Sequence, residues 1–224
     1  MITGAIFDAD GTLLDSMSVW DTIGEDYLRG IGYTPRENLS ETFQSMSLLQ
    51  AARYYRSEYG VRLSEQEIMD GVNSLLERFY REEALLKPGA EEFLRELSAH
   101  GVRLRVATAT ERPLVEAALA RGGVLEYFDG ILTCTDVGAG KDGPLIYRRA
   151  LQCVGGDRST VIVFEDALHA ARTAKADGFP VAAVYDSHEK RQDELKALAD
   201  FYLTDFSDFD SFWSFASTPH SRRV

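Results

Sequence analysis

The stretch that decides the fold is Ile2-Thr3-Gly4-Ala5-Ile6-Phe7-Asp8-Ala9-Asp10-Gly11-Thr12. It begins as a short apolar run and ends at an aspartate, a pattern typical of a buried strand. Two carboxylates two residues apart follow the run directly, and Gly11 allows a sharp turn that brings backbone close to a bound anion. The stretch therefore predicts a buried strand with a polar site at its carboxyl end.

Five further segments have the same character and are predicted as strands: Val102–Ala107, Gly130–Thr133, Thr160–Phe164, Val181–Tyr185 and Asp200–Leu203. Amphipathic helices are predicted between strands at Glu91–His100, Pro113–Arg121 and Ala167–Asp177. Proline favours the first position of a helix, and Gly101 and Gly178 favour helix ends. The alternation of strands and helices predicts an α/β fold, with a Rossmann-like parallel sheet covered by helices on both faces.

One interval interrupts this alternation. Residues 16–86 contain no strand candidate and show three helical patterns, at 17–30, 40–59 and 64–84. Ser64 and Glu67 form a capping box at the start of the third. We expect a catalytic core of residues 1–15 and 87–216 and a small all-helical cap domain of residues 16–86, inserted after the first strand. The polar residues 217–224 are expected to fray.

The charge of the chain narrows the class of ligand. The 224 residues carry a formal net charge of −12, which argues against nucleic acid or an anionic membrane as a partner. An anionic substrate then needs positive charge concentrated at the site by lysine, a metal ion or backbone N–H groups.

Other features bear on location and redox state. No apolar run approaches the roughly 18 residues of a membrane span, and the N-terminus lacks the basic segment of a signal peptide. We therefore expect a cytoplasmic protein that acts as a monomer, with a homodimer as the alternative. Cys134 and Cys153 lie far apart in apolar sequence and are expected to be buried free thiols.

Polar residues capable of chemistry follow the carboxyl ends of four predicted strands, the edge at which open parallel sheets bind ligands. They are Asp8 and Asp10, then Thr108, then Lys141, then Glu165 and Asp166. Lys141 is predicted to open the helix after the third strand. Their common placement predicts one site rather than a set of unrelated loop residues.

These residues stand in four motifs, in the order Asp8-Ala9-Asp10-Gly11-Thr12-Leu13-Leu14-Asp15-Ser16, Ala107-Thr108-Ala109-Thr110, Gly140-Lys141-Asp142-Gly143-Pro144-Leu145-Ile146-Tyr147 and Phe164-Glu165-Asp166-Ala167. Together they resemble the haloacid dehalogenase superfamily, in its phosphatase and phosphomutase branch. The resemblance covers the core from Met1 to Leu14 and from Lys87 to about Asp186, and the helical insert is similar to the cap that follows the first motif in that family. The third motif departs from the common Gly-Lys-Pro-x-Pro form, because Asp142 and Gly143 precede Pro144.

The resemblance implies a magnesium-dependent phosphatase that acts on a small phosphorylated metabolite. Asp8 is implied as the nucleophile that becomes an aspartyl-phosphate, and Asp10 as the general acid and base. Thr108 and Lys141 complete the catalytic set, and the phosphate is implied to bind Thr108, Ala109, Thr110 and Lys141. Mg²⁺ is implied to bind Asp8, the backbone carbonyl of Asp10, Glu165 and Asp166, an oxygen shell that suits this cation.

Other reactions of the family fit less well. A dehalogenase has no leaving oxygen for Asp10 to protonate, and a phosphonatase uses a cap lysine, whereas no lysine precedes Lys87. A β-phosphoglucomutase-like mutase stays open as the alternative, although the cap histidine of those enzymes is replaced here by Trp20. A non-catalytic, ligand-binding member of the family is a remote third hypothesis.

The identity of the substrate does not follow from the sequence. Polar residues of the cap are candidates for specificity: Ser16, Ser45, Ser47 and Arg53. Trp20 is predicted to be a core aromatic residue rather than a substrate contact. Asp15 is interpreted as a hinge or turn residue, and His169 as structural.

Overall fold

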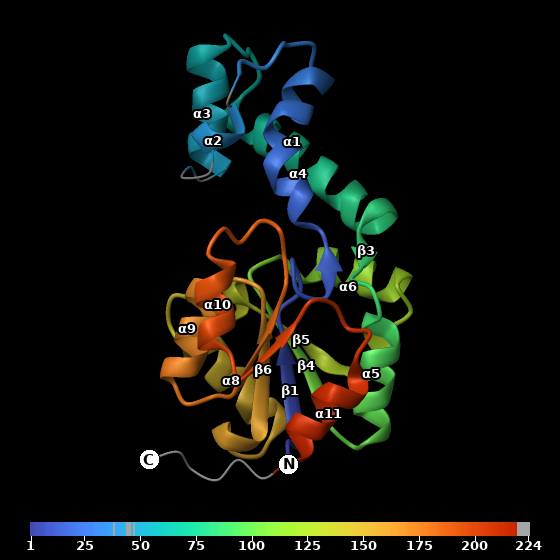
Figure 1. Ribbon diagram of the computed structural model, residues 1–224. Helices are drawn as coiled ribbons and strands as arrows, with labels where there is room; N and C mark the ends of the chain where they lie inside the picture. Colours follow the sequence, from blue (N-terminus) through green and yellow to red (C-terminus); the bar gives the residue numbers. More distant parts are fainter. Residues whose placement is uncertain (38, 44–45, 47, 219–224) are drawn as a thin grey trace. The chain divides into compact units, whose positions relative to one another are not determined.

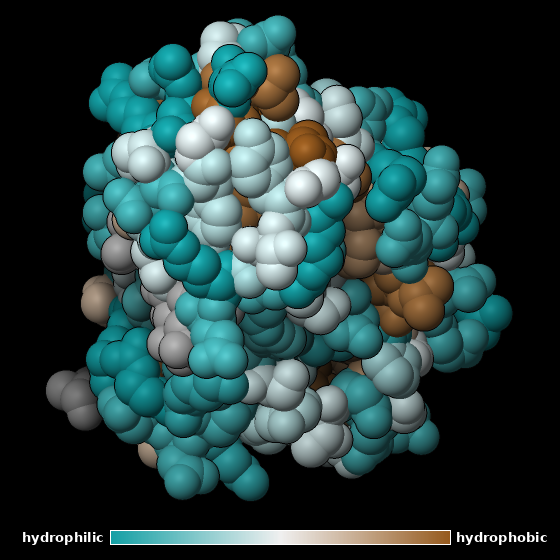
Figure 2. Space-filling view, turned by 90° about the horizontal axis from the view of Figure 1, so that it is seen from above, coloured by the Kyte–Doolittle hydropathy of each residue, from teal (hydrophilic) through white to brown (hydrophobic). Residues whose placement is uncertain are grey.

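The computed structural model describes residues 1–37, 39–43, 46 and 48–218, and the chain divides into two compact units (Figure 1). One combines Met1–Asp15 with Ala84–Val224 and contains the sheet, and the other is Ser16–Glu83. The face drawn in Figure 2 is mostly hydrophilic, in line with the 27% of charged residues. Within the described residues, no helix has both the length and the apolar character needed to cross a membrane.

The sheet of the first unit has six strands in the order β5-β4-β1-β6-β7-β8, and every neighbouring pair is parallel. The strands are β1 (Gly4–Phe7), β4 (Arg103–Thr108), β5 (Phe128–Thr133), β6 (Val161–Glu165), β7 (Val181–Val184) and β8 (Phe201–Leu203). All six strands predicted from the sequence are present. The chain winds from β1 to β5 and then from β6 to β8, so the strand order reverses between β1 and β6.

Helices cover both faces of the sheet (Figure 1), which confirms the predicted α/β fold. They include α5 (Ala90–Ala99), α6 (Arg112–Arg121), α8 (Leu145–Val154), α9 (Leu168–Ala176), α10 (Gln192–Leu198) and α11 (Phe209–Ser217). Successive residues of β1 point to opposite faces. Ile6 belongs to a mainly aliphatic core with residues of α8, α9 and α10, whereas Phe7 stacks on Phe164 with ring centroids 4.1 Å apart. Phe93 of α5 meets Phe164 edge-on at 5.8 Å, so aromatic rings pack the second face.

The sequence prediction omits α7 (Cys134–Val137), α10 and α11, and it gives no bounds for α8, the helix expected after the third strand. One reason is that α7 has only four residues; another is that α11 is rich in aromatic residues, which favour strands. Because α8 begins at Leu145, Lys141 lies in the turn before this helix and does not open it. Ser217 is the last residue of α11 rather than part of a frayed tail, and residues 219–224 lie outside the described residues.

Both cysteines are free, as predicted, but they are not buried. Cys134 is half-buried and Cys153 is exposed. The buried residues of α8 are Ile146, Tyr147, Ala150 and Val154, and position 153 falls outside this face of the helix. The apolar sequence around Cys153 therefore gave the wrong prediction of its exposure.

The second unit is helical. Its elements are α1 (Met17–Gly30), α2 (Leu39–Phe43), α3 (Leu48–Glu58), α4 (Glu65–Arg78) and a π-helix, η1 (Phe79–Glu83). The single helix predicted over 40–59 is wrong, because α2 ends at Phe43 and α3 begins at Leu48. Met46, the described residue between them, is not helical.

Buried side chains of α1, α3 and α4 form the core of this unit, among them Tyr27, Tyr55 and Ile68. The Tyr55 hydroxyl donates to the carbonyl of Gly24 at 2.7 Å. The predicted capping box is confirmed: the N–H of Glu67 donates to Ser64 Oγ, and the Glu67 carboxylate accepts from the Ser64 N–H.

A two-stranded antiparallel ladder lies where the chain leaves and re-enters the first unit. It is made of β2 (Leu14–Asp15) and β3 (Leu85–Leu86), with Leu14 opposite Leu86. The N–H of Lys87 donates to the carbonyl of Leu13 at 2.8 Å and extends the pairing. Strands of two residues cannot show an alternating pattern, so this ladder could not be predicted from the sequence.

The Lys87 side chain connects the β2–β3 ladder to the loop after β7. Its Nζ donates to Asp186 Oδ2 at 2.6 Å and to the carbonyl of Tyr185 at 3.1 Å, and Asp186 also accepts from the N–H of His188 at 2.9 Å. Burial by itself would raise the pKa of the Asp186 carboxyl. The hydrogen bonds from Lys87 and His188 outweigh burial, so the pKa lies below its ordinary value.

We predict that Lys87→Met lowers the free energy of unfolding at pH 7 by roughly 3–5 kcal/mol, because Asp186 is left buried without its ion partner. In the wild type, the lowered pKa of Asp186 adds to the free energy of unfolding. This contribution is complete above the Asp186 pKa of the unfolded chain, about 3.9, and is lost as the pH falls through the pKa of the folded protein. The difference in free energy of unfolding between the two proteins, measured by urea denaturation, should therefore shrink as the pH is lowered from 7 towards 3.

The control is Lys190→Met, which removes an exposed lysine whose Nζ donates to the carbonyl of Ser187 at 3.3 Å. It is expected to change stability by no more than about 0.5 kcal/mol. A difference between wild type and Lys87→Met that is independent of pH contradicts the assignment to Asp186.

Candidate active site

Asp8 and Glu165 lie side by side at the carboxyl ends of two neighbouring strands. In the β1–β6 ladder Phe7 is opposite Phe164, so the residues that follow them are also neighbours. The N–H of Asp8 donates to the carbonyl of Phe164 at 3.0 Å and holds this register. Asp8 is 9% exposed and Glu165 is fully buried. They stand at the reversal of strand order, where open α/β sheets bind ligands.

Lys141 pairs with both carboxylates. The turn between α7 and α8 brings its Nζ against Asp8 Oδ1 and to 2.7 Å from Glu165 Oε1. Burial by itself would lower the pKa of Lys141, but the two carboxylates outweigh it and raise the pKa, so the ammonium group stays charged. For Asp8, burial raises the pKa to about 7, with further contributions from Glu165 and Asp10, against the opposing effect of Lys141.

Asp166 completes a group of three buried carboxylates. One carboxylate oxygen from each of Asp8, Glu165 and Asp166 lies within 4.8 Å of the others. Asp166 Oδ1 accepts from the Thr12 hydroxyl at 2.8 Å. Burial is the largest cause that raises the Asp166 pKa above its ordinary range, followed by the charges of Asp8 and Glu165.

This group fits a hard divalent cation. Glu165 Oε2 is buried and has no hydrogen-bond partner within the part of the chain that the structure describes, and such an oxygen is costly to leave unpaired. All the side-chain donors are oxygens, and one lysine faces three carboxylates. Both features suit a cation such as Mg²⁺ or Ca²⁺. The carbonyl of Asp10 as a further ligand remains a prediction.

Asp10 is linked to the predicted phosphate-binding segment. The turn that carries it depends on Gly11, whose φ of +78° lies in the left-handed region that favours glycine. The Thr110 hydroxyl donates to Asp10 Oδ2 at 2.6 Å, and the N–H of Thr110 donates to Thr108 Oγ1 at 3.0 Å. Thr108 ends β4, the neighbour of β1, and Ala109 is exposed in the bend that follows. The residues predicted from the four motifs are thus brought to the same edge of the sheet.

Two side chains in the motifs were not predicted to serve the site. Tyr147 is fully buried, and its hydroxyl donates to Glu165 Oε1 at 2.7 Å. Thr12 is fully buried and donates to Asp166. The available signal was chemical: a hydroxyl in an apolar stretch needs a partner when it is buried. The sequence cannot tell which partner it finds.

The candidates for specificity in the helical insert are only partly described. Ser16 is buried, and Arg53 Nε pairs with Glu65 Oε1 at 3.2 Å. Ser45 and Ser47 lie outside the described residues. Trp20 is 44% exposed, so its prediction as a core aromatic residue is wrong. The other buried residues of α1 besides Val19 are in its last turn, and Trp20 belongs to the first.

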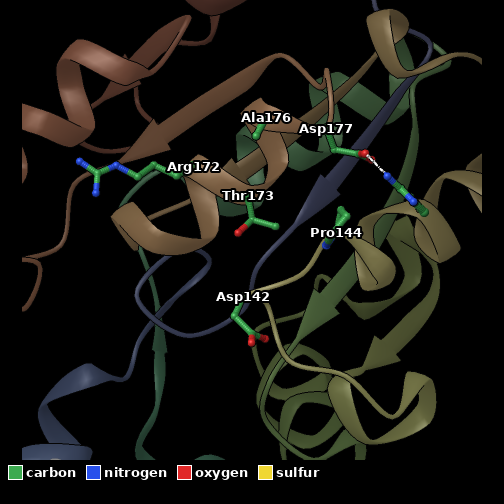
Figure 3. Close-up of a pocket in the computed structure, with 7 residues that line it drawn as sticks. Asp142, Pro144, Arg172, Thr173, Ala176 and Asp177 are labelled. Carbon is green, nitrogen blue, oxygen red and sulfur yellow. Dashed lines mark hydrogen bonds and ion pairs between the residues drawn. The ribbon is translucent and has the colours of Figure 1, made fainter.

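A surface pocket lies between α8 and α9, beside the loop that carries Lys141 (Figure 3). Its lining residues are Asp142, Pro144, Arg148, Arg172, Thr173, Ala176 and Asp177. Arg148 pairs with Asp177 at 2.5 Å, and Arg172 pairs with Glu194 at 2.6 Å. The pocket contains none of the predicted site residues, and its cationic groups are already paired, so we do not place the chemistry there.

The sequence of this chain was compared with known protein families. Residues 2–178, more than half of the chain, match the family model of the haloacid dehalogenase-like hydrolases. The chain therefore belongs to this family, and the resemblance inferred from its four motifs is confirmed. The expectation that the chain is a hydrolase agrees with this membership.

Two curated relatives are phosphatases by name. Hexitol phosphatase B of Escherichia coli (strain K12) is 24% identical over 209 residues, which cover 92% of this chain and 94% of the relative. Validoxylamine A 7'-phosphate phosphatase of Streptomyces hygroscopicus subsp. limoneus is 28% identical over 204 residues, or 91% and 94% of the two chains. The solved structure of a putative β-phosphoglucomutase from Thermotoga maritima has a TM-score of 0.83 at 22% identity and covers 96% and 99%; this likeness shows the fold alone.

We predict that Lys141→Met lowers the free energy of unfolding in EDTA by roughly 3–5 kcal/mol, because it leaves two buried carboxylates without their cation. Urea denaturation measures the change. Lys190→Met again serves as the control, since it removes a lysine from the surface. A loss no larger than that of the control contradicts the view that Lys141 compensates the charge of Asp8 and Glu165.

Proposed function

We propose that this chain is a magnesium-dependent phosphatase that hydrolyses a small phosphorylated sugar or a related metabolite, with Asp8 as its nucleophile. The observation that carries the proposal is the buried ion pair of Asp8 with Lys141, next to the carboxylates of Glu165 and Asp166. Membership of the hydrolase family supports it. The names of the two phosphatase relatives support the class of substrate.

In the first step, a carboxylate oxygen of Asp8 attacks the phosphorus of the substrate. The bond between phosphorus and the leaving oxygen breaks, and Asp10 gives its proton to that oxygen. In the second step, water attacks the phosphorus of the aspartyl-phosphate, Asp10 takes a proton from this water, and the bond between phosphorus and Asp8 breaks. One difficult displacement is thereby divided into two easier ones, and acid–base catalysis contributes roughly 10²–10⁴-fold.

The residues beside Asp8 are proposed to hold the phosphoryl group during transfer. They are the Thr108 hydroxyl, the N–H group of Ala109 and the ammonium group of Lys141. The N–H group of Thr110, which donates to Thr108 Oγ1 in the structure, would turn to the phosphate when it binds. The hydrogen bond from the Thr110 hydroxyl to Asp10 at 2.6 Å keeps this segment next to the proposed acid and base. Local positive charge of this kind lets a chain with a net charge of −12 bind an anion.

Asp8, Glu165 and Asp166 are proposed to hold Mg²⁺, with the carbonyl of Asp10 as a further ligand. The unpaired Glu165 Oε2 and the excess of carboxylates over lysine support this assignment. When bound, the ion offsets the repulsion between the anionic nucleophile and the anionic substrate.

Hydrolysis is preferred to a mutase reaction on features of this chain. Trp20 occupies the position of the histidine expected in the cap of a mutase, and no lysine precedes Lys87 that could bind a second phosphate. Arginines are present in this segment, among them Arg29, Arg36, Arg53 and Arg56. A screen of sugar phosphates and sugar-alcohol phosphates, with β-glucose 1-phosphate included, separates the two reactions. A phosphatase releases inorganic phosphate, whereas a mutase yields an isomeric sugar phosphate.

We expect Asp8→Asn to reduce turnover by roughly 10⁴-fold or more, because the amide oxygen is a poor nucleophile for phosphorus. Release of inorganic phosphate from p-nitrophenyl phosphate and from the best substrate of the screen measures this. Asp26→Asn, an exchange of the same kind at an exposed residue of α1, should keep wild-type activity. Near-normal turnover by Asp8→Asn excludes the mechanism, and an inactive wild type would favour the non-catalytic hypothesis.

Chelation should abolish activity reversibly. Treatment with EDTA followed by desalting is expected to reduce phosphate release to background, and added Mg²⁺ should restore it. Without a cation, the three carboxylates repel an anionic substrate. Addition of Na⁺ at matched ionic strength is the control and should restore nothing. Full activity in EDTA would argue against the metal assignment.

A further inference from the structure

The Tyr147 side chain contacts the carboxylate of Glu165. It lies in the first turn of α8, six residues after Lys141, and it is fully buried. Its hydroxyl donates to Glu165 Oε1 at 2.7 Å, across 18 residues of sequence. Phenylalanine would fill the same space, so the hydroxyl is the part of this side chain that needs an explanation.

The two oxygens of Glu165 differ in their surroundings. Oε1 receives two donors, the Lys141 ammonium group at 2.7 Å and the Tyr147 hydroxyl at 2.7 Å. Oε2 is equally buried and has no hydrogen-bond partner among the described residues. Two donors on one oxygen resist rotation of the carboxylate, so the same oxygen stays unpaired.

We propose that Tyr147 is a positioning residue that fixes the Glu165 carboxylate so that Oε2 is presented to a divalent cation. This inference rests on the proposed function, because the cation is the one assigned to Asp8, Glu165 and Asp166. Lys141 alone is an inadequate guide for Glu165, because it is shared with Asp8. The Tyr147 hydroxyl makes a directional bond to Glu165 and thereby sets its orientation.

The test compares Tyr147→Phe with a matched control. Tyr55→Phe removes the same hydroxyl from another buried tyrosine, whose partner is the carbonyl of Gly24 in the helical unit. Each protein is freed of metal with EDTA, desalted and titrated with Mn²⁺, and the signal of free Mn²⁺ in electron paramagnetic resonance gives the Kd. Loss of a partner that orients a ligand is expected to raise the Kd of Tyr147→Phe about 10–100-fold. The control should stay within about twofold of the wild type.

Two further measurements separate positioning from a merely structural role. Thermal melts in EDTA report the stability of the metal-free proteins, and a structural role predicts a loss in these melts with an unchanged Kd for Mn²⁺. The dependence of kcat on Mg²⁺ should shift to higher concentration in Tyr147→Phe, with kcat at saturation within a few fold of the wild type.

The outcomes distinguish this inference from the proposed function. If the wild type binds Mn²⁺ and Tyr147→Phe binds it equally well, the role of Tyr147 is overturned while the metal site stands. If the wild type itself binds no Mn²⁺, both are overturned. A raised Kd in Tyr147→Phe with a normal Kd in Tyr55→Phe supports the inference.

Discussion

The arrangement of the site depends on the charge balance of one lysine among buried acids. Lys141 pairs with Asp8 and Glu165, and Asp166 adds a third carboxylate at the same point. Buried charges of one sign are tolerated only where opposite charge or hydrogen bonds compensate them. The turn before α8, the Thr12 hydroxyl and the Tyr147 hydroxyl all serve this compensation. Their positions are explained by the acids rather than by the sheet alone.

The parallel ladder sets where these acids meet. Residues that follow Phe7 and Phe164 are neighbours because β1 and β6 run in the same direction in register. The aromatic stack on one face of these strands and the aliphatic core on the other hold the register firmly. A shift by one residue would exchange the two faces. Core packing therefore fixes the position of Asp8 relative to the other carboxylates.

The sequence predicted the parts of this molecule that are governed by local patterns. Buried parallel strands are short apolar runs, so all six strands of the sheet were recognised, and the acids that follow them were placed at one edge. The strands of the β2–β3 ladder are too short to show an alternating pattern, and the aromatic residues of α11 suggest no helix. The exposure of Trp20 and Cys153 depends on which neighbours cover a helix face, which local sequence does not encode.

The site shows the same division. Asp8, Lys141 and Glu165 were named from their motifs, whereas the bond between Tyr147 and Glu165 joins residues on different elements. A hydroxyl in a helical stretch indicates that a partner is needed but not which one. Tertiary structure alone supplies that partner, because the crossover from α8 to β6 brings them together.

The β2–β3 ladder has a consequence for how this architecture can change over evolution. Both points at which the chain leaves and re-enters the sheet unit are held together by a ladder that belongs to that unit. From the viewpoint of chain entropy, the helical insert is a loop whose ends are already closed, and the cost of closing a loop grows only slowly with its length. Insertions, deletions or even exchange of the helical segment therefore place little burden on the fold of the sheet. Such a junction allows the helical segment to change while the carboxylates of the sheet unit keep their positions.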